Sequence, residues 1–166
     1  MYCRLLDFIN DWENETRETG ILFSALTDES LKTKVYEGGR TLGQIVWHIV
    51  VTNGEMGEKA GFKGDFLPED APVPNSAKEI QDAYKKQTEE ILRVVSTQWH
   101  DEDLSDPIEM YGQRWLKGSI LCILILHQAH HRGQITVLMR QAGLKVHGVC
   151  GPSKEEWQSF GLKPME

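Results

Sequence analysis

The residues of this chain best suited to chemistry are three histidines that occur in two apolar segments. Two of them, His127 and His131, are four positions apart and follow a run of seven apolar residues at 120–126. No Gly or Pro interrupts residues 119–132, so the pattern predicts a helix that is buried nearly all round. A helix places side chains four positions apart on one face, about one turn from each other. This is the spacing with which a helix offers two imidazole nitrogens to one metal ion.

The third histidine, His48, lies in an equally apolar segment at residues 45–51. Burying an imidazole is costly unless the ring is hydrogen-bonded or binds a metal. If two helices bring His48 against His127 and His131, three neutral imidazoles can bind one divalent cation and leave a position for water or substrate. Zinc, nickel and ferrous iron all accept such nitrogens. The alternative is a set of core histidines hydrogen-bonded to neighbouring groups.

Other residues near these histidines are weaker candidates. His130 can also reach the side of the helix that carries His127, which leaves its role open. Glu55 shares a helix face with His48, about 10 Å along the axis, and is either a proton acceptor at a pocket mouth or a solvated surface acid. Cys150 is a possible reactive thiol, but a plain loop cysteine is the expected reading.

Several established catalytic motifs are excluded. The residue after His127 is Gln128, which cannot serve as the general base of an HExxH protease. No histidine at 48, 127, 130 or 131 has a Glu three residues before it, which excludes the di-iron bundles built on Glu-x-x-His pairs. Motifs of the CxxCH, GxGxxG, Walker and GxSxG types are absent from the sequence. Haem ligation by these histidines is disfavoured, because three clustered imidazoles exceed what haem needs.

Composition places the chain among ordinary globular proteins. Its 166 residues, 40% hydrophobic and 26% charged, predict a single domain over residues 1–166. A net charge of −7 without a basic block argues against a nucleic-acid partner, and no segment reaches the roughly 18 apolar residues of a membrane span. Acidic residues near the N-terminus are unlike a signal peptide, and three cysteines without a CxxC pair favour a reducing compartment. We therefore expect a cytoplasmic location.

Hydrophobic periodicity predicts the elements that must position the histidines. Four long helices are expected at about 2–26, 41–60, 76–97 and 115–142, with a short helix in the tail at 154–160. Capping-box patterns at residues 41–44 and 76–79 mark two of the helix starts, and Gly143 stands where a glycine ends the fourth helix. A short extended piece is expected near 108–111. Four long helices favour an all-α fold, a four-helix bundle with a short helical tail.

Two segments resemble the DinB/YfiT-like superfamily. They are the His-x-x-His-His-Arg-Gly-Gln pattern at 127–134 and the segment 40–48, which ends in Trp-His. The resemblance implies a bundle with up-down-down-up connectivity, often dimeric, whose metal-binding histidines correspond to His48, His127 and His131. It leaves His130 either to support the site or to pack the helix. Some members of the superfamily use a low-molecular-weight thiol in isomerase or S-transferase reactions, and its name, from a DNA-damage-inducible member, does not imply DNA binding.

Taken together, these patterns predict a metal-dependent enzyme. One divalent cation, zinc, nickel or iron, would turn bound water or a low-molecular-weight thiol into a nucleophile, for hydrolysis in the first case and for transfer or isomerisation in the second. The sequence offers no clear general base that would separate these reactions. The expected partners are a small-molecule substrate and a second copy of the chain. The alternative is a non-catalytic metal- or small-ligand-binding module of a bacterial stress response.

Overall fold

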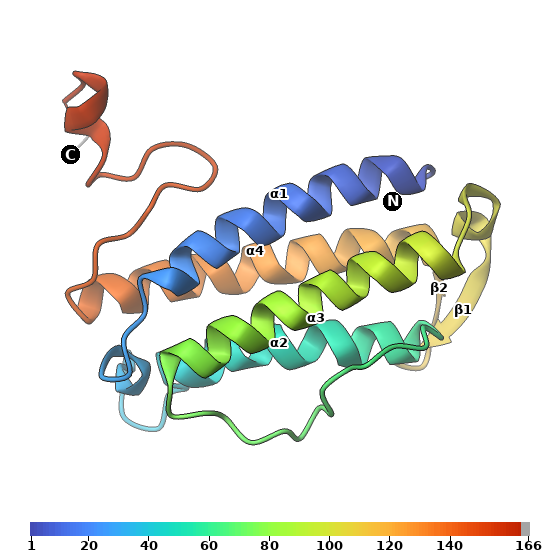
Figure 1. The fold of residues 1–166 in the computed structure, drawn as a ribbon, viewed down its shortest axis with the longest axis horizontal. Helices are drawn as coiled ribbons and strands as arrows, with labels where there is room; N and C mark the ends of the chain where they lie inside the picture. The colour runs from blue at the N-terminus through green and yellow to red at the C-terminus, as the bar shows by residue number, and fades with distance from the viewer. Residues whose placement is uncertain (164–166) are drawn as a thin grey trace.

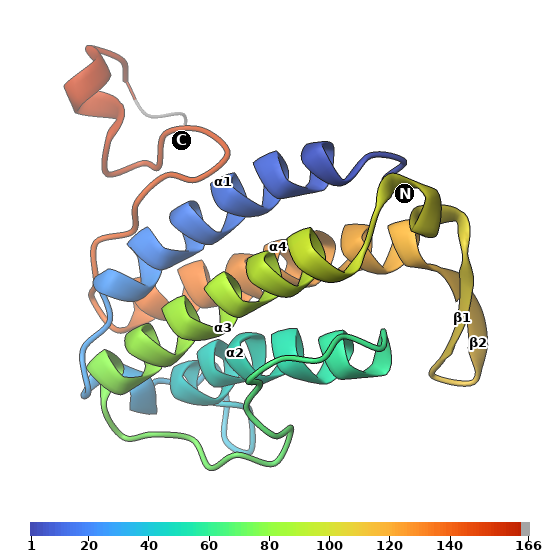
Figure 2. The same ribbon diagram turned by 45° about the vertical axis from the view of Figure 1, so that its right-hand side comes forward.

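The computed structural model describes residues 1–163 and contains the four predicted long helices. Their bounds are α1 (Leu5–Ser24), α2 (Leu42–Lys59), α3 (Ala77–Gln98) and α4 (Lys117–Gln141). Figures 1 and 2 show that α1 and α4 run in one direction while α2 and α3 run in the other. Packing contacts join α1 to α3, α3 to α2, α2 to α4 and α4 to α1. The predicted all-α bundle with up-down-down-up connectivity is therefore confirmed.

The helix ends follow local hydrogen bonding. Thr41 accepts from the Gln44 N–H at 3.2 Å, and the Gln44 side chain accepts from the Thr41 N–H at 2.8 Å, which completes the predicted capping box. At the start of α3, Ser76 accepts from a backbone N–H at 3.4 Å. After α4, Gly143 adopts φ 75°, and the N–H groups of Gly143 and Leu144 bond back to carbonyls of the last turn. This is the Schellman arrangement that a glycine permits.

The interior of the bundle has two apolar clusters separated by a polar layer. One cluster gathers the end of α1, the beginnings of α2 and α3 and the end of α4, and the other gathers the opposite ends. Between them on every helix lie buried polar side chains: Thr19, Thr52, Asn53, Gln87, Thr88, Gln128, His131 and Arg132. Burying polar groups is costly unless they have partners. This layer is therefore the part of the interior in which functional side chains are expected.

Two connecting segments differ from the sequence-based expectation. The piece expected near 108–111 is one strand of a hairpin, β1 (Pro107–Met110) paired antiparallel with β2 (Gln113–Leu116). Its two-residue turn has φ 53° at Tyr111 and φ 71° at Gly112, as tight hairpin turns require. The tail forms a 3₁₀ turn rather than the longer helix expected. The short turns are η1 (Ser30–Lys32), η2 (Asp101–Ser105) and η3 (Trp157–Phe160).

The prediction that the histidine-bearing helix is buried nearly all round was wrong. α4 packs against α1 and α2, but Leu126 and Val137 on its outer face are 55% and 51% exposed. In a square bundle each helix packs against two neighbours. The outward face of α4 therefore stays exposed, although it carries apolar residues. None of the helices within residues 1–163 combines the length and apolarity needed to cross a membrane.

Candidate metal centre

α2 and α4 bring the three histidines singled out by the sequence to one point in the groove between them. The Nε2 atom of His127 lies 3.2 Å from Nε2 of His48 and 3.1 Å from Nε2 of His131. Each residue offers one such ligand atom, and all of these atoms lie within 4.8 Å of one another. The convergence of side chains 79 positions apart follows from the packing of α2 on α4.

Two neighbouring side chains orient the rings. Nδ1 of His131 lies 2.8 Å from Oε1 of Gln134. A carboxamide oxygen only accepts hydrogen bonds, so Nδ1 carries the proton and Nε2 presents a lone pair to the cluster. On α2, Oγ1 of Thr52 lies 3.3 Å from Nδ1 of His48, and this contact likewise leaves Nε2 of that ring facing the other two histidines.

This arrangement fits a divalent cation better than it fits hydrogen bonding among the rings. The neutral His131 ring has one N–H, and Gln134 accepts it. In a tetrahedral zinc site, bonds of about 2.0–2.1 Å place the nitrogens about 3.3–3.4 Å apart. The separations of Nε2 of His127 from Nε2 of His48 and of His131, 3.2 and 3.1 Å, are close to that nitrogen–nitrogen distance. Metal binding by these residues stays a prediction, but their geometry suits it.

The environment keeps the three rings neutral. Burial, together with the smaller effects of the neighbouring His131 and His48, lowers the pKa of His127 to about 4. Burial also lowers the pKa of His48 and of His131, with the positive charge of Arg40 acting in the same direction on both. Near neutral pH the rings are unprotonated, so their lone pairs are available without the loss of a proton.

His130 lies outside the cluster. Its exposed ring meets Nε2 of Gln134 at 3.3 Å, and its centroid is 4.8 Å from that of His131. The role of His130, in supporting the site or in packing the helix, stays a prediction. Sequence reasoning missed Thr52, although its place one turn after His48 on the same helix was a usable signal.

Glu55 is not a solvated surface acid. Its side chain is 11% exposed and forms an ion pair with Lys59. The hydroxyl of Tyr111, at the tip of the β1–β2 hairpin, lies 2.9 and 2.7 Å from its two oxygens. Hydrogen bonds thus engage both carboxylate oxygens, and Glu55 fastens the hairpin to α2 instead of presenting a free base.

A buried ion pair secures the polar layer beside the cluster. Arg132, the residue after His131, has an 8% exposed side chain and pairs with Glu15 of α1. The same guanidinium donates to Oγ1 of Thr19 at 3.2 Å. The pair of Arg132 and Glu15 joins α1 to α4 next to the histidines and so fixes the part of α4 that carries them.

Cys150 is an exposed free thiol whose Sγ lies 3.9 Å from Arg132.

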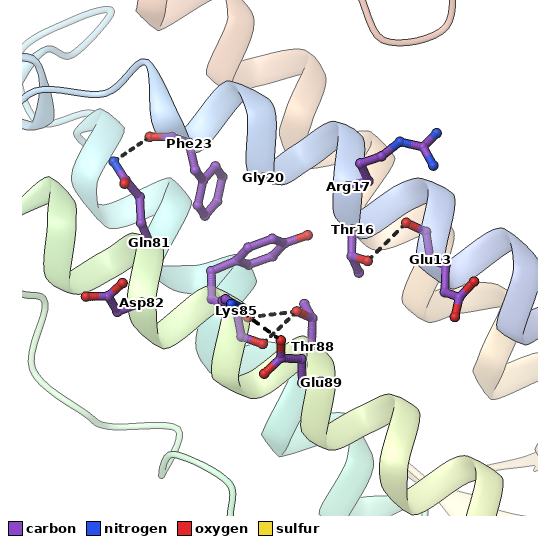
Figure 3. Close-up of a pocket in the computed structure, with 11 residues that line it drawn as sticks. Glu13, Thr16, Arg17, Gly20, Phe23, Gln81, Asp82, Lys85, Thr88 and Glu89 are labelled. Atoms are coloured by element: carbon purple, nitrogen blue, oxygen red, sulfur yellow. Dashed lines mark hydrogen bonds and ion pairs between the residues drawn. The ribbon is translucent and has the colours of Figure 1, made fainter.

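Two cavities lie on opposite sides of the bundle. One, of about 440 Å³, lies between α1 and α3 and is bordered by charged side chains from both helices (Figure 3). The other, of about 470 Å³, is lined by His131 and Gln134 together with Arg40 and several apolar side chains. Of the three clustered histidines, His131 is among the residues that line the second cavity, so this cavity lies beside the cluster on the α2–α4 side of the bundle.

Comparisons with known proteins agree with this architecture. The family model described as "DinB family" matches residues 1–165. A protein of Bacillus subtilis (strain 168) named "Uncharacterized protein YrdA" is 45% identical over 98% of both chains. A solved DinB-like protein from Bacillus cereus ATCC 10987 is 41% identical with a TM-score of 0.87, covering 90% of this chain and 99% of that one. Another from Bacillus subtilis, YjoA, has 19% identity and a TM-score of 0.66 over 84% and 96%, which shows the fold alone.

Proposed function

This chain belongs to the DinB family, and on that premise we propose that it is an enzyme that uses one divalent cation bound by His48, His127 and His131. The observation that carries the proposal is the convergence of three imidazoles, with Nε2 of His127 3.2 Å from that of His48 and 3.1 Å from that of His131, and all three ligand atoms within 4.8 Å of one another. The lowered pKa values of the three imidazoles support the same reading. Zinc, nickel and iron(II) are the candidate metals.

A cation held by three neutral imidazoles lowers the pKa of a coordinated water or thiol and supplies a nucleophile near neutral pH. The chain's own residues position that chemistry. Gln134 and Thr52 fix the orientation of His131 and His48, and the adjoining cavity of about 470 Å³ has the size of a small-molecule site. The substrate is therefore a small molecule that enters the groove between α2 and α4.

Of the two reactions, transfer to or from a low-molecular-weight thiol is favoured over hydrolysis. No carboxylate is among the residues lining the His131 cavity in the described part of the chain, 1–163. Glu55 is engaged by Tyr111 and Lys59. A thiol, with a pKa of about 8.5, ionises at a metal without a general base, whereas activation of water benefits from one. The thiolate sulfur would attack an electrophilic carbon, and the leaving group would depart with its electron pair.

The test combines metal analysis with an assay of thiol consumption. Protein reconstituted with zinc, nickel or iron(II) should hold one equivalent of metal and should consume thiol in the presence of an electrophile such as chlorodinitrobenzene. His48→Ala should lose both properties, and His100→Ala, a change at an exposed histidine, should lose neither. If His48→Ala held as much metal as wild type, the proposed three-histidine metal site would be ruled out. Metal binding without turnover of thiols, esters or amides would favour the non-catalytic binding module.

We also propose that the protein acts as a homodimer. The support is the outer face of α4, where Leu126 and Val137 are exposed and where a second copy would cover apolar surface that the chain's own helices leave open. Light scattering on wild type and on Leu126→Lys would test it, with loss of the dimer expected in the variant and a wild-type monomer contradicting the proposal.

A further inference from the structure

The cavity next to the histidine cluster also contains an arginine. Arg40, immediately before α2, lines it together with His131 and Gln134. Apolar side chains make up most of the remaining wall: Val35, Tyr36, Ile45, Val137 and Leu138. The cavity thus has one cationic side chain, Arg40, and one ring of the histidine cluster, His131, in a largely apolar wall. Such a site can distinguish the two ends of a ligand.

A braced loop presents Arg40. Lys34 and Thr41 form an antiparallel bridge at the base of the loop, and Thr41 is fixed by the capping box of α2. At the tip, Gly38 adopts φ 80°, which a turn with glycine in its third position requires. The backbone of Arg40 is therefore held at both sides, and less freedom is lost when its side chain binds a ligand.

Among the described residues, 1–163, no Asp or Glu forms an ion pair with the Arg40 guanidinium. Glu37, the acid of the same loop, pairs with Lys34 at 2.8 Å, and none of the residues lining the cavity within 1–163 is an Asp or Glu. The charge of Arg40 reaches the cluster, because it helps to lower the pKa of His48 and of His131. Three neutral imidazoles would leave the charge of a bound divalent cation uncompensated. A ligand with negative charge would therefore be favoured at two places, beside Arg40 and beside a cation bound by the histidines.

We infer, resting on the function proposed above, that this cavity binds a small reactant bearing a carboxylate, which Arg40 receives while the reacting end is directed to His48, His127 and His131. The apolar walls receive the carbon chain between the two ends. A guanidinium recognises a carboxylate through paired N–H donors, which lysine does not reproduce. Either the thiol or its electrophilic partner can carry the carboxylate, and the experiment below separates the two.

The first arm measures binding by titration calorimetry on the zinc-loaded protein. Mercaptoacetate, mercaptopropionate and mercaptobutyrate are compared with the mercaptoalcohols of the same lengths, so that each pair differs in charge. If the thiol carries the carboxylate, the acid of best length binds about tenfold more tightly than its alcohol. Arg40→Gln removes that preference and leaves the affinity for the alcohols unchanged. Arg40→Lys restores part of it, and Lys32→Gln, a loss of positive charge at an exposed residue outside this cavity, changes neither.

The second arm repeats the titration with propionate and butyrate while saturating mercaptoethanol is present. If the electrophilic partner carries the carboxylate, the acids of the first arm show no advantage over the alcohols. Propionate or butyrate then binds alongside mercaptoethanol and does so only while Arg40 is present. The inference is overturned if binding of neither set of carboxylates depends on Arg40, or if Arg40→Gln weakens the binding of acids and alcohols equally.

Metal content and thermal midpoint are measured on each variant. Failure to bind zinc at all would overturn the proposed function as well, whereas zinc binding without a carboxylate preference would overturn this inference alone.

Discussion

The carboxamide oxygen of Gln134 accepts a hydrogen bond from Nδ1 of His131 at 2.8 Å. This contact sets the tautomer of His131 and aims its Nε2 at the other two histidines. Groups that orient metal-binding histidines in this way typically contribute about 10- to 100-fold to metal affinity.

Removing that acceptor should weaken the metal centre without unfolding the protein. Gln134 is exposed, so Gln134→Ala should leave the thermal midpoint of the metal-free protein nearly unchanged. We expect its zinc affinity to fall by about 10- to 100-fold in a competition titration with a chelating dye. Gln134→Glu keeps an acceptor in place and should retain most of the affinity. Equal zinc affinity in wild type and Gln134→Ala would show that the ring needs no such support.

The buried pair of Arg132 and Glu15 should dominate the local stability of the polar layer. Arg132→Met leaves the Glu15 carboxylate without its partner, and we expect the free energy of unfolding in urea to fall by about 3–5 kcal/mol. Arg140, on the same helix, pairs with Glu155 at the surface at 3.1 Å. Arg140→Met should therefore cost less than about 1 kcal/mol. Similar losses in the two variants would contradict the assignment of Arg132 as an interior tie between α1 and α4.

The metal-free protein should lose stability on acidification partly through His127. Its pKa is lowered to about 4 in the folded state, against about 6.5 in an unfolded chain. Below pH 6.5 the unfolded state therefore binds a proton that the folded state does not, so stability declines as the pH falls from about 6.5 to about 4. In His127→Gln this contribution is absent. Urea unfolding of both proteins in the presence of EDTA should give a steeper decline for wild type across that range, and parallel curves would refute the shift.

The hydroxyl of Tyr111 should control the motion of the β1–β2 hairpin. Tyr111→Phe removes the hydrogen bond to Glu55 and keeps the aromatic contact with Trp115, whose ring centroid is 5.7 Å away. We expect faster hydrogen exchange of the hairpin amides and an unchanged zinc content, because the loss is confined to the anchor on α2. Exchange rates equal to wild type would mean that packing, rather than this bond, holds the hairpin.

The sequence predicted the helices and the pair His127 and His131 because both depend on local spacing, and it pointed to His48 through its apolar setting and the family resemblance. Such features can be recognised from residues that are neighbours in the sequence. They are the cap at Thr41, the glycine at 143 and the four-residue interval from His127 to His131. What escaped prediction depends on tertiary placement. Arg40 lines the same cavity as His131 only because its loop folds beside α4, and the burial of Glu55 depends on the hairpin. The exposure of the outer face of α4 was not predicted, because in an apolar run the sequence does not distinguish an exposed leucine such as Leu126 from a buried one.

The central claim is that three imidazoles from α2 and α4 bind one divalent cation, and anomalous diffraction from crystals of the zinc-reconstituted protein tests it most directly. The account predicts a single strong peak at the zinc edge, about 2.0–2.1 Å from Nε2 of His48, His127 and His131, with a fourth position open to solvent or ligand. A protein that takes up no zinc, or a peak centred on other residues such as His100 or His147 with these three rings unbound, would contradict it.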